Sequence, residues 1–187
     1  MKSTAVLSSL LEDTISVMLH AHVSETRATP PPQRWAGTVH IGGGFDGVVV
    51  LECAKDAARR AAAALVGNDD VDALSDDDVA DAFAEMTNIV GGNAKATLSA
   101  TLSTTRSTTL STTLSTTASQ MTPSMTPSPT GRGDTCTLSL PVVHRDGVVD
   151  VDGDELYRRS FVFCRDVFVV RVLEAPGHGP PRPRRSA

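Results

Sequence analysis

The sequence has few of the features that mark several common functional classes. Its 187 residues include only three cysteines, Cys53, Cys136 and Cys164, at wide spacings within apolar segments. An odd number at such spacings predicts reduced core thiols, and neither a disulfide framework nor a zinc site. Lysine and arginine number 17 against 22 aspartates and glutamates, a net charge of −5. This balance gives no electrostatic reason to bind nucleic acid or an anionic membrane surface.

Long apolar runs and metal-binding patterns are also missing. Glu12 and Asp13 interrupt the apolar N-terminal stretch before a signal-peptide core or a membrane span could form. Aspartates cluster between residues 69 and 78, but no window supplies the glycine at position six and the glutamate at position twelve of an EF-hand loop. We therefore expect a cytoplasmic protein without a metal site of its own.

One internal segment lacks the residues that build a core. Of the 32 residues from Ser99 to Thr130, 20 are serine or threonine, and only Arg106 is charged. Consecutive serines and threonines form helices poorly, although leucines spaced by multiples of four leave a helical continuation as the alternative. We expect a disordered insertion over residues 99–131 and a disordered Pro/Arg-rich tail over residues 175–187. Residues 1–174 then form a single domain with this insertion inside it.

The rest of the chain alternates between helical and strand patterns. We expect helices at about residues 4–23, at 54–66 and from Ser75, as the N-cap, to about Leu98. Strands are expected at residues 35–41, 48–53, 135–143, 161–164 and 167–173, with a tight turn at Arg165 and Asp166. This order predicts an α+β fold in which a long helix packs on a mostly antiparallel sheet.

The long helix has two distinct faces. At about 100° per residue, one stripe is apolar and faces the core: Val79, Phe83, Met86 and Val90. The opposite face carries three polar residues and a glycine: Asp81, Glu85, Asn88 and Gly92. Glu85 and Asn88 are three residues apart, so they are neighbours on adjacent turns, and Gly92 would let another surface approach closely. On spacing alone, such a face is ordinary solvated helix surface.

The wider pattern is more specific. Asp81-xxx-Glu85-xx-Asn88, followed by Ile89-Val90-Gly91-Gly92-Asn93, resembles the signature helix of the CheX and CheC phosphatase family, which acts on phosphorylated CheY-type response regulators. That signature is Asp or Ser, Glu four residues later, Asn three further, and then a proline. Pro141 follows Asn88 after 52 residues, roughly 30 more than the family spacing, and the Ser/Thr insertion accounts for the excess.

The resemblance implies a reaction and a role for each residue. The substrate would be an aspartyl phosphate on a partner's receiver domain, and that partner would supply Mg²⁺ and a lysine, so the chain itself would need no cofactor. Asn88 would orient the attacking water and Glu85 would pair with the partner's lysine. Asp81 and Gly92 would contact the partner, and Asn93 and Pro141 would support the motif.

Two other interpretations of this helix fit the same residues. A non-catalytic adapter would use the same helix to bind a receiver domain or a second copy without turnover. A small α+β scaffold would carry Glu85 and Asn88 without any function. An exposed sheet edge also makes a homodimer possible.

Overall fold

The structure of the protein is a computed structural model that describes residues 2–29, 34–114, 136–145 and 149–176, with the backbone alone for 2–5 and 101–114. The helices are α1 (Lys2–Met18), α2 (Lys55–Val66) and α3 (Asp76–Leu114), with a 3₁₀ turn at Val71–Ala73. The strands are β1 (Ser24–Thr26), β2 (Arg34–Gly42), β3 (Gly47–Ala54), β4 (Thr137–Leu138), β5 (Val142–His144), β6 (Asp154–Phe163) and β7 (Asp166–Glu174).

The strands form one antiparallel sheet in the order β1-β6-β7-β3-β2-β4, and β5 also pairs with β2. Strands β2 and β3 form one hairpin, and β6 and β7 form another. The two hairpins are joined into one sheet by the pairing of β3 with β7. This topology confirms the predicted α+β class with a mostly antiparallel sheet.

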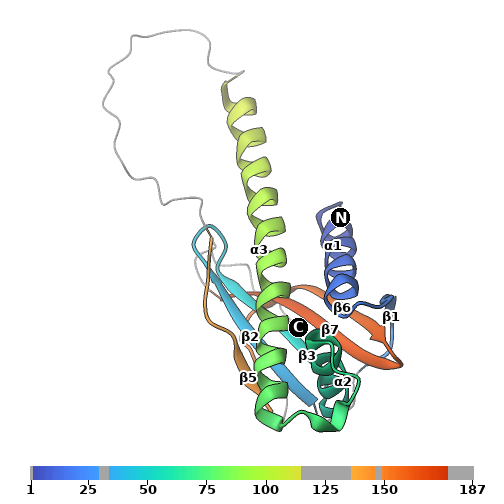
Figure 1. Ribbon diagram of the computed structural model, residues 1–187. Helices are drawn as coiled ribbons and strands as arrows, with labels where there is room; N and C mark the ends of the chain where they lie inside the picture. The colour runs from blue at the N-terminus through green and yellow to red at the C-terminus, as the bar shows by residue number, and fades with distance from the viewer. Residues whose placement is uncertain (1, 30–33, 115–135, 146–148, 177–187) are drawn as a thin grey trace, which may run out of the picture.

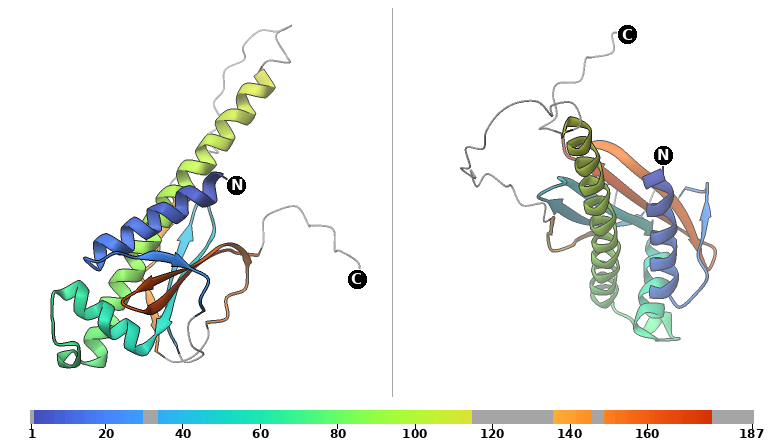
Figure 2. Two further views of the ribbon diagram at one scale, coloured as in Figure 1. Left: turned by 90° about the vertical axis from the view of Figure 1, so that its right-hand side faces the viewer. Right: turned by 90° about the horizontal axis from the view of Figure 1, so that it is seen from above.

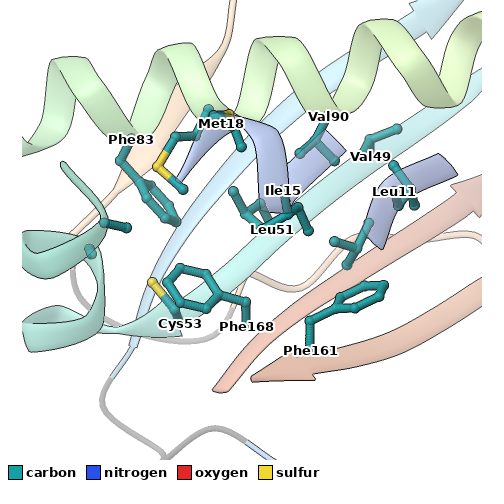
Figure 3. Close-up of a cluster of buried hydrophobic side chains, with 14 of the residues drawn as sticks. Leu11, Ile15, Met18, Val49, Leu51, Cys53, Phe83, Val90, Phe161 and Phe168 are labelled. Carbon is teal, nitrogen blue, oxygen red and sulfur yellow. The ribbon is translucent and has the colours of Figure 1, made fainter. Parts of the chain in front are cut away.

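All three helices pack on one face of this sheet, and the main core lies between the two layers (Figures 1 and 2). Alternate residues of the long strands β2, β3 and β7 enter it, as the two-residue period of a strand requires. In the close-up, Phe83 and Val90 of α3 point toward the same cluster as Leu51 of β3 and Ile15 of α1 (Figure 3). The apolar stripe predicted for α3 is therefore confirmed as its core-facing side.

Helix α3 is longer than the sequence predicted. The expected end lay near Leu98, but the helix continues to Leu114 and its C-terminal part projects beyond the sheet (Figure 1). The expectation of disorder from Ser99 onward is thus wrong for residues 99–114. At the start of this stretch, the Ser99 hydroxyl donates to the Lys95 carbonyl four residues back at 2.8 Å, as Thr97 does to Asn93 at 3.1 Å, so these side chains stay within the helix. Residues 115–131 of the predicted insertion and 177–187 of the predicted tail lie outside the described residues.

Two predicted boundaries also shift because the chain uses non-glycine residues in the left-handed conformation. Helix α1 ends at Met18 rather than near residue 23, since His20 has φ of 50° and closes a Schellman motif with Ala21 bonded to the Ser16 carbonyl at 3.1 Å. The β6–β7 turn is centred on Cys164 and Arg165, with φ of 48° and 73°, one residue before the predicted position.

The strand predicted at residues 135–143 is divided into β4 and β5, which both pair with β2. Pro141 lies in the interruption, where its missing backbone N–H cannot contribute to a ladder. Among the described residues, no helix combines the length and the apolar content needed to cross a membrane.

Candidate functional site

The beginning of α3 is fixed by a reciprocal cap. The Asp78 backbone N–H donates to the Ser75 hydroxyl oxygen at 3.1 Å, and the Ser75 N–H and hydroxyl donate to the Asp78 carboxylate at 3.0 and 2.6 Å. These bonds hold the pKa of Asp78 below its ordinary value. Asp76 is bound by Lys55 at 2.9 Å and by Arg59, both from α2. The predicted N-cap is confirmed, and it gives the site a rigid starting point.

The middle of α3 lies directly on β2 because two small residues allow a close approach. A Cβ added at Gly37 of β2 would stand 1.9 Å from the Thr87 hydroxyl oxygen, and one added at Gly91 would stand 2.3 Å from Cγ1 of Val39. Thr87 is fully buried and donates its hydroxyl to the Phe83 carbonyl at 2.8 Å. This contact was not predicted from the sequence, since a single glycine in a strand or a helix gives no sign of what packs against it.

The predicted site residues lie on the side of α3 that faces away from the core. Asp81 and Glu85 are exposed, while Asn88 and Gly92 are half-buried. A Cβ at Gly92 would meet nothing within 4 Å, so the backbone there is open to approach. Asn93 lies apart from this group, because its amide donates to the Ile89 carbonyl of its own helix at 3.1 Å.

Within the described residues, the side chains of Glu85 and Asn88 take part in no hydrogen bond or ion pair. Their acceptor and donor groups are therefore available to a binding partner. Both residues come from one stiff helix whose backbone is held by the cap and by the packing on β2. Their relative position, one turn apart, does not depend on any loop.

The edge segment 138–145, which contains β5, runs beside the N-terminal half of α3 (Figure 1). Near one end of this segment, Cδ1 of Leu138 is 3.8 Å from the position of a Cβ on Gly91. At the other end, the Arg145 guanidinium binds the Asp77 carboxylate at 2.5 Å. The fourteen residue-to-residue steps from Asp77 to Gly91 rise about 21 Å, and the seven steps from Leu138 to Arg145 span about 23 Å.

These matching lengths indicate that strand and helix stay in step between their two contacts. About two helix residues then correspond to each strand residue, so Pro141 lies alongside the turn of α3 that carries Glu85 and Asn88. The half-buried state of Asn88 agrees with this position, since it is closer to the edge segment around the helix than Glu85 is.

Arg145 places a cation at the N-terminal end of the same face. Its guanidinium carbon lies 5.8 Å from the centroid of the Trp35 ring, and its bond to Asp77 raises its pKa, with smaller contributions from Asp76 and Asp81. Arg145 was not among the site residues predicted from the sequence. Its only signal was a basic residue shortly after the strand that contains Pro141.

The face offers a carboxylate and an amide to a binding partner. Among the described residues, no group of three histidine, cysteine, aspartate or glutamate side chains could hold a metal ion. An exposed carboxylate can bind a cationic group of a partner, and an amide can both donate to and accept from a water molecule. The face can therefore dock on a polar surface and position a water.

The segment that contains this face matches a known protein family. Residues 35–127 match the family model described as chemotaxis phosphatase CheX. The chain contains a CheX-family domain. The matched range includes the whole pattern from Asp81 to Asn93 and ends before Pro141, so the assignment of Pro141 to the family motif stays a prediction. No curated protein matches the sequence.

Solved structures of CheX proteins are among those with a similar fold. CheX from Vibrio vulnificus has a TM-score of 0.60 at 14% identity, covering 92% of this chain and 96% of that one. CheX from Desulfovibrio desulfuricans has a TM-score of 0.57 at 16% identity, with 93% and 99% covered. A CheX–CheY–BeF3–Mg²⁺ complex from Borrelia burgdorferi gives 0.56 at 13% identity, with 90% and 95% covered. At these identities the likeness establishes the fold, and it confirms the predicted fold family.

Proposed function

We propose that this CheX domain removes the phosphoryl group from an aspartyl phosphate on a CheY-type receiver domain and so ends a two-component signal in the cytoplasm. The observation that carries the proposal is the unpartnered pair Glu85 and Asn88, one turn apart on the outer face of α3, in the spacing of the family signature. The family description as a phosphatase and the solved CheX–CheY complex support the same choice of partner.

Asn88 would orient the water that attacks the phosphorus. Phosphoryl transfer gains mostly from positioning and from stabilisation of charge, and it requires the water to stand in line with the leaving oxygen. An amide suits this task because its oxygen accepts a hydrogen from the water while its NH₂ group donates to a neighbouring oxygen. The half-buried position of Asn88 limits its rotamers, which favours a defined geometry.

Glu85 would bind the lysine at the receiver's phosphorylation site. A charge-assisted hydrogen bond becomes stronger when the interface excludes water, so this pair would fix α3 onto the partner. Asp81, one turn earlier, would assist docking, and the open backbone at Gly92 would let the partner come close. The Mg²⁺ would belong to the receiver domain, and the CheX domain would contribute no cofactor.

The decisive experiment follows the decay of phosphorylated CheY-type receiver domains with wild-type protein, Glu85→Ala and Asn88→Ala. Loss of one positioned group costs about 10²-fold to 10³-fold in rate, so we expect Asn88→Ala to abolish most of the acceleration. Asn68→Ala and Glu12→Ala remove the same side-chain types outside α3 and should retain the wild-type rate.

Binding measured in parallel separates the two candidate functions. Accelerated decay by wild type, lost in Asn88→Ala while binding persists, would establish the phosphatase. Binding without acceleration would identify a non-catalytic adapter. Neither binding nor acceleration with a panel of receiver domains would refute the proposal.

Self-association is a separate proposal. The sheet has an edge at β1 and another along β4 and β5, and either could pair with the same edge of a second copy. Light scattering distinguishes a 19.6 kDa monomer from a particle of twice that mass. A mass near 20 kDa at the concentrations used for the decay assay would rule out a homodimer there.

A further inference from the structure

Arg145 joins the end of the edge segment to the first turn of α3. Its guanidinium binds the Asp77 carboxylate at 2.5 Å, across 68 positions of sequence, and its guanidinium carbon lies 5.8 Å from the centroid of the Trp35 ring. The Asp77 side chain is 85% exposed and that of Arg145 is 44% exposed, so solvent screens the attraction and its contribution to global stability is small. The pair can still fix the position of the segment that carries Arg145.

The register of β5 places this segment beside the turn of α3 that carries Asn88. Val143 of β5 pairs with Gly37 of β2, and a Cβ added at Gly37 would stand 1.9 Å from the Thr87 hydroxyl oxygen. Side chains directly opposite each other in a strand pair lie on the same face of the sheet, so Val143 points to the side of α3 and packs on the main core. Thr87 directly precedes Asn88, and α3 contacts β5.

Arg145 attaches β5 to the helix itself. It lies two residues after Val143, so its side chain points to the same face of the sheet, where it reaches Trp35 and Asp77. Strand β5 is only three residues long, and its ladder to β2 joins it to the edge of the sheet. The ion pair adds a direct connection from the end of this short strand to α3.

Asn88 is the site residue closest to this line of contact. At about 100° per residue, Asn88 lies within about 20° of Asp77 around the helix axis, whereas Glu85 lies about 80° away. Asn88 is also half-buried, while Asp81 and Glu85 are exposed. An edge segment held firmly against α3 therefore restricts the rotamers of Asn88 more than those of Glu85.

We propose that Arg145 is a positioning residue: by binding Asp77 it holds the edge segment against α3, which keeps the Asn88 amide oriented toward the attacking water. This inference rests on the proposed function. Arg145 acts through the edge segment and does not touch the substrate. Its loss should lower turnover and leave docking through Glu85 in place.

The opposite edge of the sheet offers a matched control. Arg159 of β6 binds Glu25 of β1 at 2.9 Å, and its guanidinium carbon lies 5.6 Å from the centroid of the Tyr157 ring. Its side chain is 39% exposed, so Arg159 makes the same two kinds of contact as Arg145 at nearly the same exposure. Arg159→Ala and Arg145→Ala should therefore cost similar stability, whereas only Arg145→Ala should affect turnover.

The test measures kcat and KM for wild type, Arg145→Ala, Asp77→Asn and Arg159→Ala with a receiver domain that the wild type dephosphorylates. Urea unfolding checks that each variant is folded. Asp77→Asn removes the same ion pair at a largely exposed position, so it decides the question if Arg145→Ala does not fold. We expect kcat to fall by about 5-fold to 10-fold in both variants of the pair, because loosening a positioned group costs less than its displacement by about 1 Å. Their KM should stay within about twofold of the wild type, and Arg159→Ala should match the wild type.

Two further measurements show whether Arg145 acts through the edge segment and Asn88. In the Asn88→Ala background, Arg145→Ala should lower kcat by less than about twofold, because the group that it positions is already absent. Hydrogen exchange of the β5 amides, measured without a receiver, should be faster in Arg145→Ala and Asp77→Asn than in wild type. It should be unchanged in Arg159→Ala.

Each other result has a definite meaning. Unchanged kcat in Arg145→Ala and Asp77→Asn, with turnover still lost in Asn88→Ala, would overturn this inference and leave the proposed function standing. A rise in KM at unchanged kcat would also overturn it, because Arg145 would then serve docking. So would an equal loss of kcat in Arg159→Ala, or a loss in Arg145→Ala that persists in full in the Asn88→Ala background. Failure of the wild type with every receiver would refute the proposed function and this inference together.

Discussion

Two adjacent glycines of α3 give a test of how this helix packs. Gly91 faces β2, where an added Cβ would stand 2.3 Å from Cγ1 of Val39, whereas a Cβ at Gly92 would meet nothing within 4 Å. An alanine in place of a helical glycine contributes up to about 1 kcal/mol of helix propensity at either position. The two Gly→Ala variants should therefore differ only in what the new methyl group meets.

The overlap at Gly91 cannot be relieved cheaply. Val39 is fully buried in a central part of β2, and a β-branched side chain has restricted rotamers, so the strand or the helix must move. Overpacking of this kind costs about 1–3 kcal/mol. After the gain in helix propensity, Gly91→Ala should lower the free energy of unfolding by about 1 kcal/mol, with about 2 kcal/mol as the upper end. Gly92→Ala should raise it by about 0.5–1 kcal/mol.

Urea unfolding followed by circular dichroism measures both values, and the opposite signs are the essential outcome. In a domain of this size, 1 kcal/mol corresponds to a shift of about 2–4 °C in Tm. Stabilisation by both substitutions would refute the close approach of α3 to β2, and with it the position assigned to the edge segment. Gly92→Ala also adds a methyl group to the proposed docking face, so it should weaken receiver binding while it stabilises the fold.

Three further outcomes follow from the cap and the cysteines. Ser75→Ala removes the cap of α3 and should lower the free energy of unfolding by about 1 kcal/mol at pH 7, measured in urea. The pKa of Asp78 is lower in the folded than in the unfolded state, so its ionised form stabilises the fold above about pH 4, and this stabilisation is lost as the pH falls through the folded-state pKa. The difference in the free energy of unfolding between wild type and Ser75→Ala should therefore shrink at that pH. Burial raises the pKa of Cys53 well above its ordinary value, so iodoacetamide should label the exposed Cys164 in native protein and Cys53 only in urea, as peptide mass spectrometry would show.

Local patterns predicted the parts of the molecule that local forces determine. The core stripe of α3 could be read from the helical period, and the cap at Ser75 from a hydroxyl followed by carboxylates in the first turn. The β2–β3 hairpin followed from two β-rich runs around a glycine-rich connection. The outward direction of Glu85 followed from the same helical period, because four buried residues fix the opposite face.

The parts that sequence reasoning missed depend on contacts between distant segments. Nothing near Gly91 shows that Val39 lies against it, and nothing near Arg145 shows that Asp77 will bind it. The turn at Cys164 has no glycine or asparagine to mark its left-handed residues, and Asp166 after it is held by Arg60 of α2 through two bonds of 2.6 Å. Tertiary contacts of this kind override local propensity.

The long insertion need not disturb the proposed site, as the reach of the chain shows. From Gly91, where Leu138 lies close by, α3 continues for 23 residues to Leu114, a rise of about 35 Å. The 22 residues from 115 to 136 can span up to about 75 Å, about twice the distance needed to return to β4. Lengthening a connection costs only about 0.6 kcal/mol for each doubling. The extension of α3 and the connection that follows it can thus be inserted between Asn88 and Pro141 without moving the edge segment. That segment keeps its place beside α3 because it is hydrogen-bonded to β2.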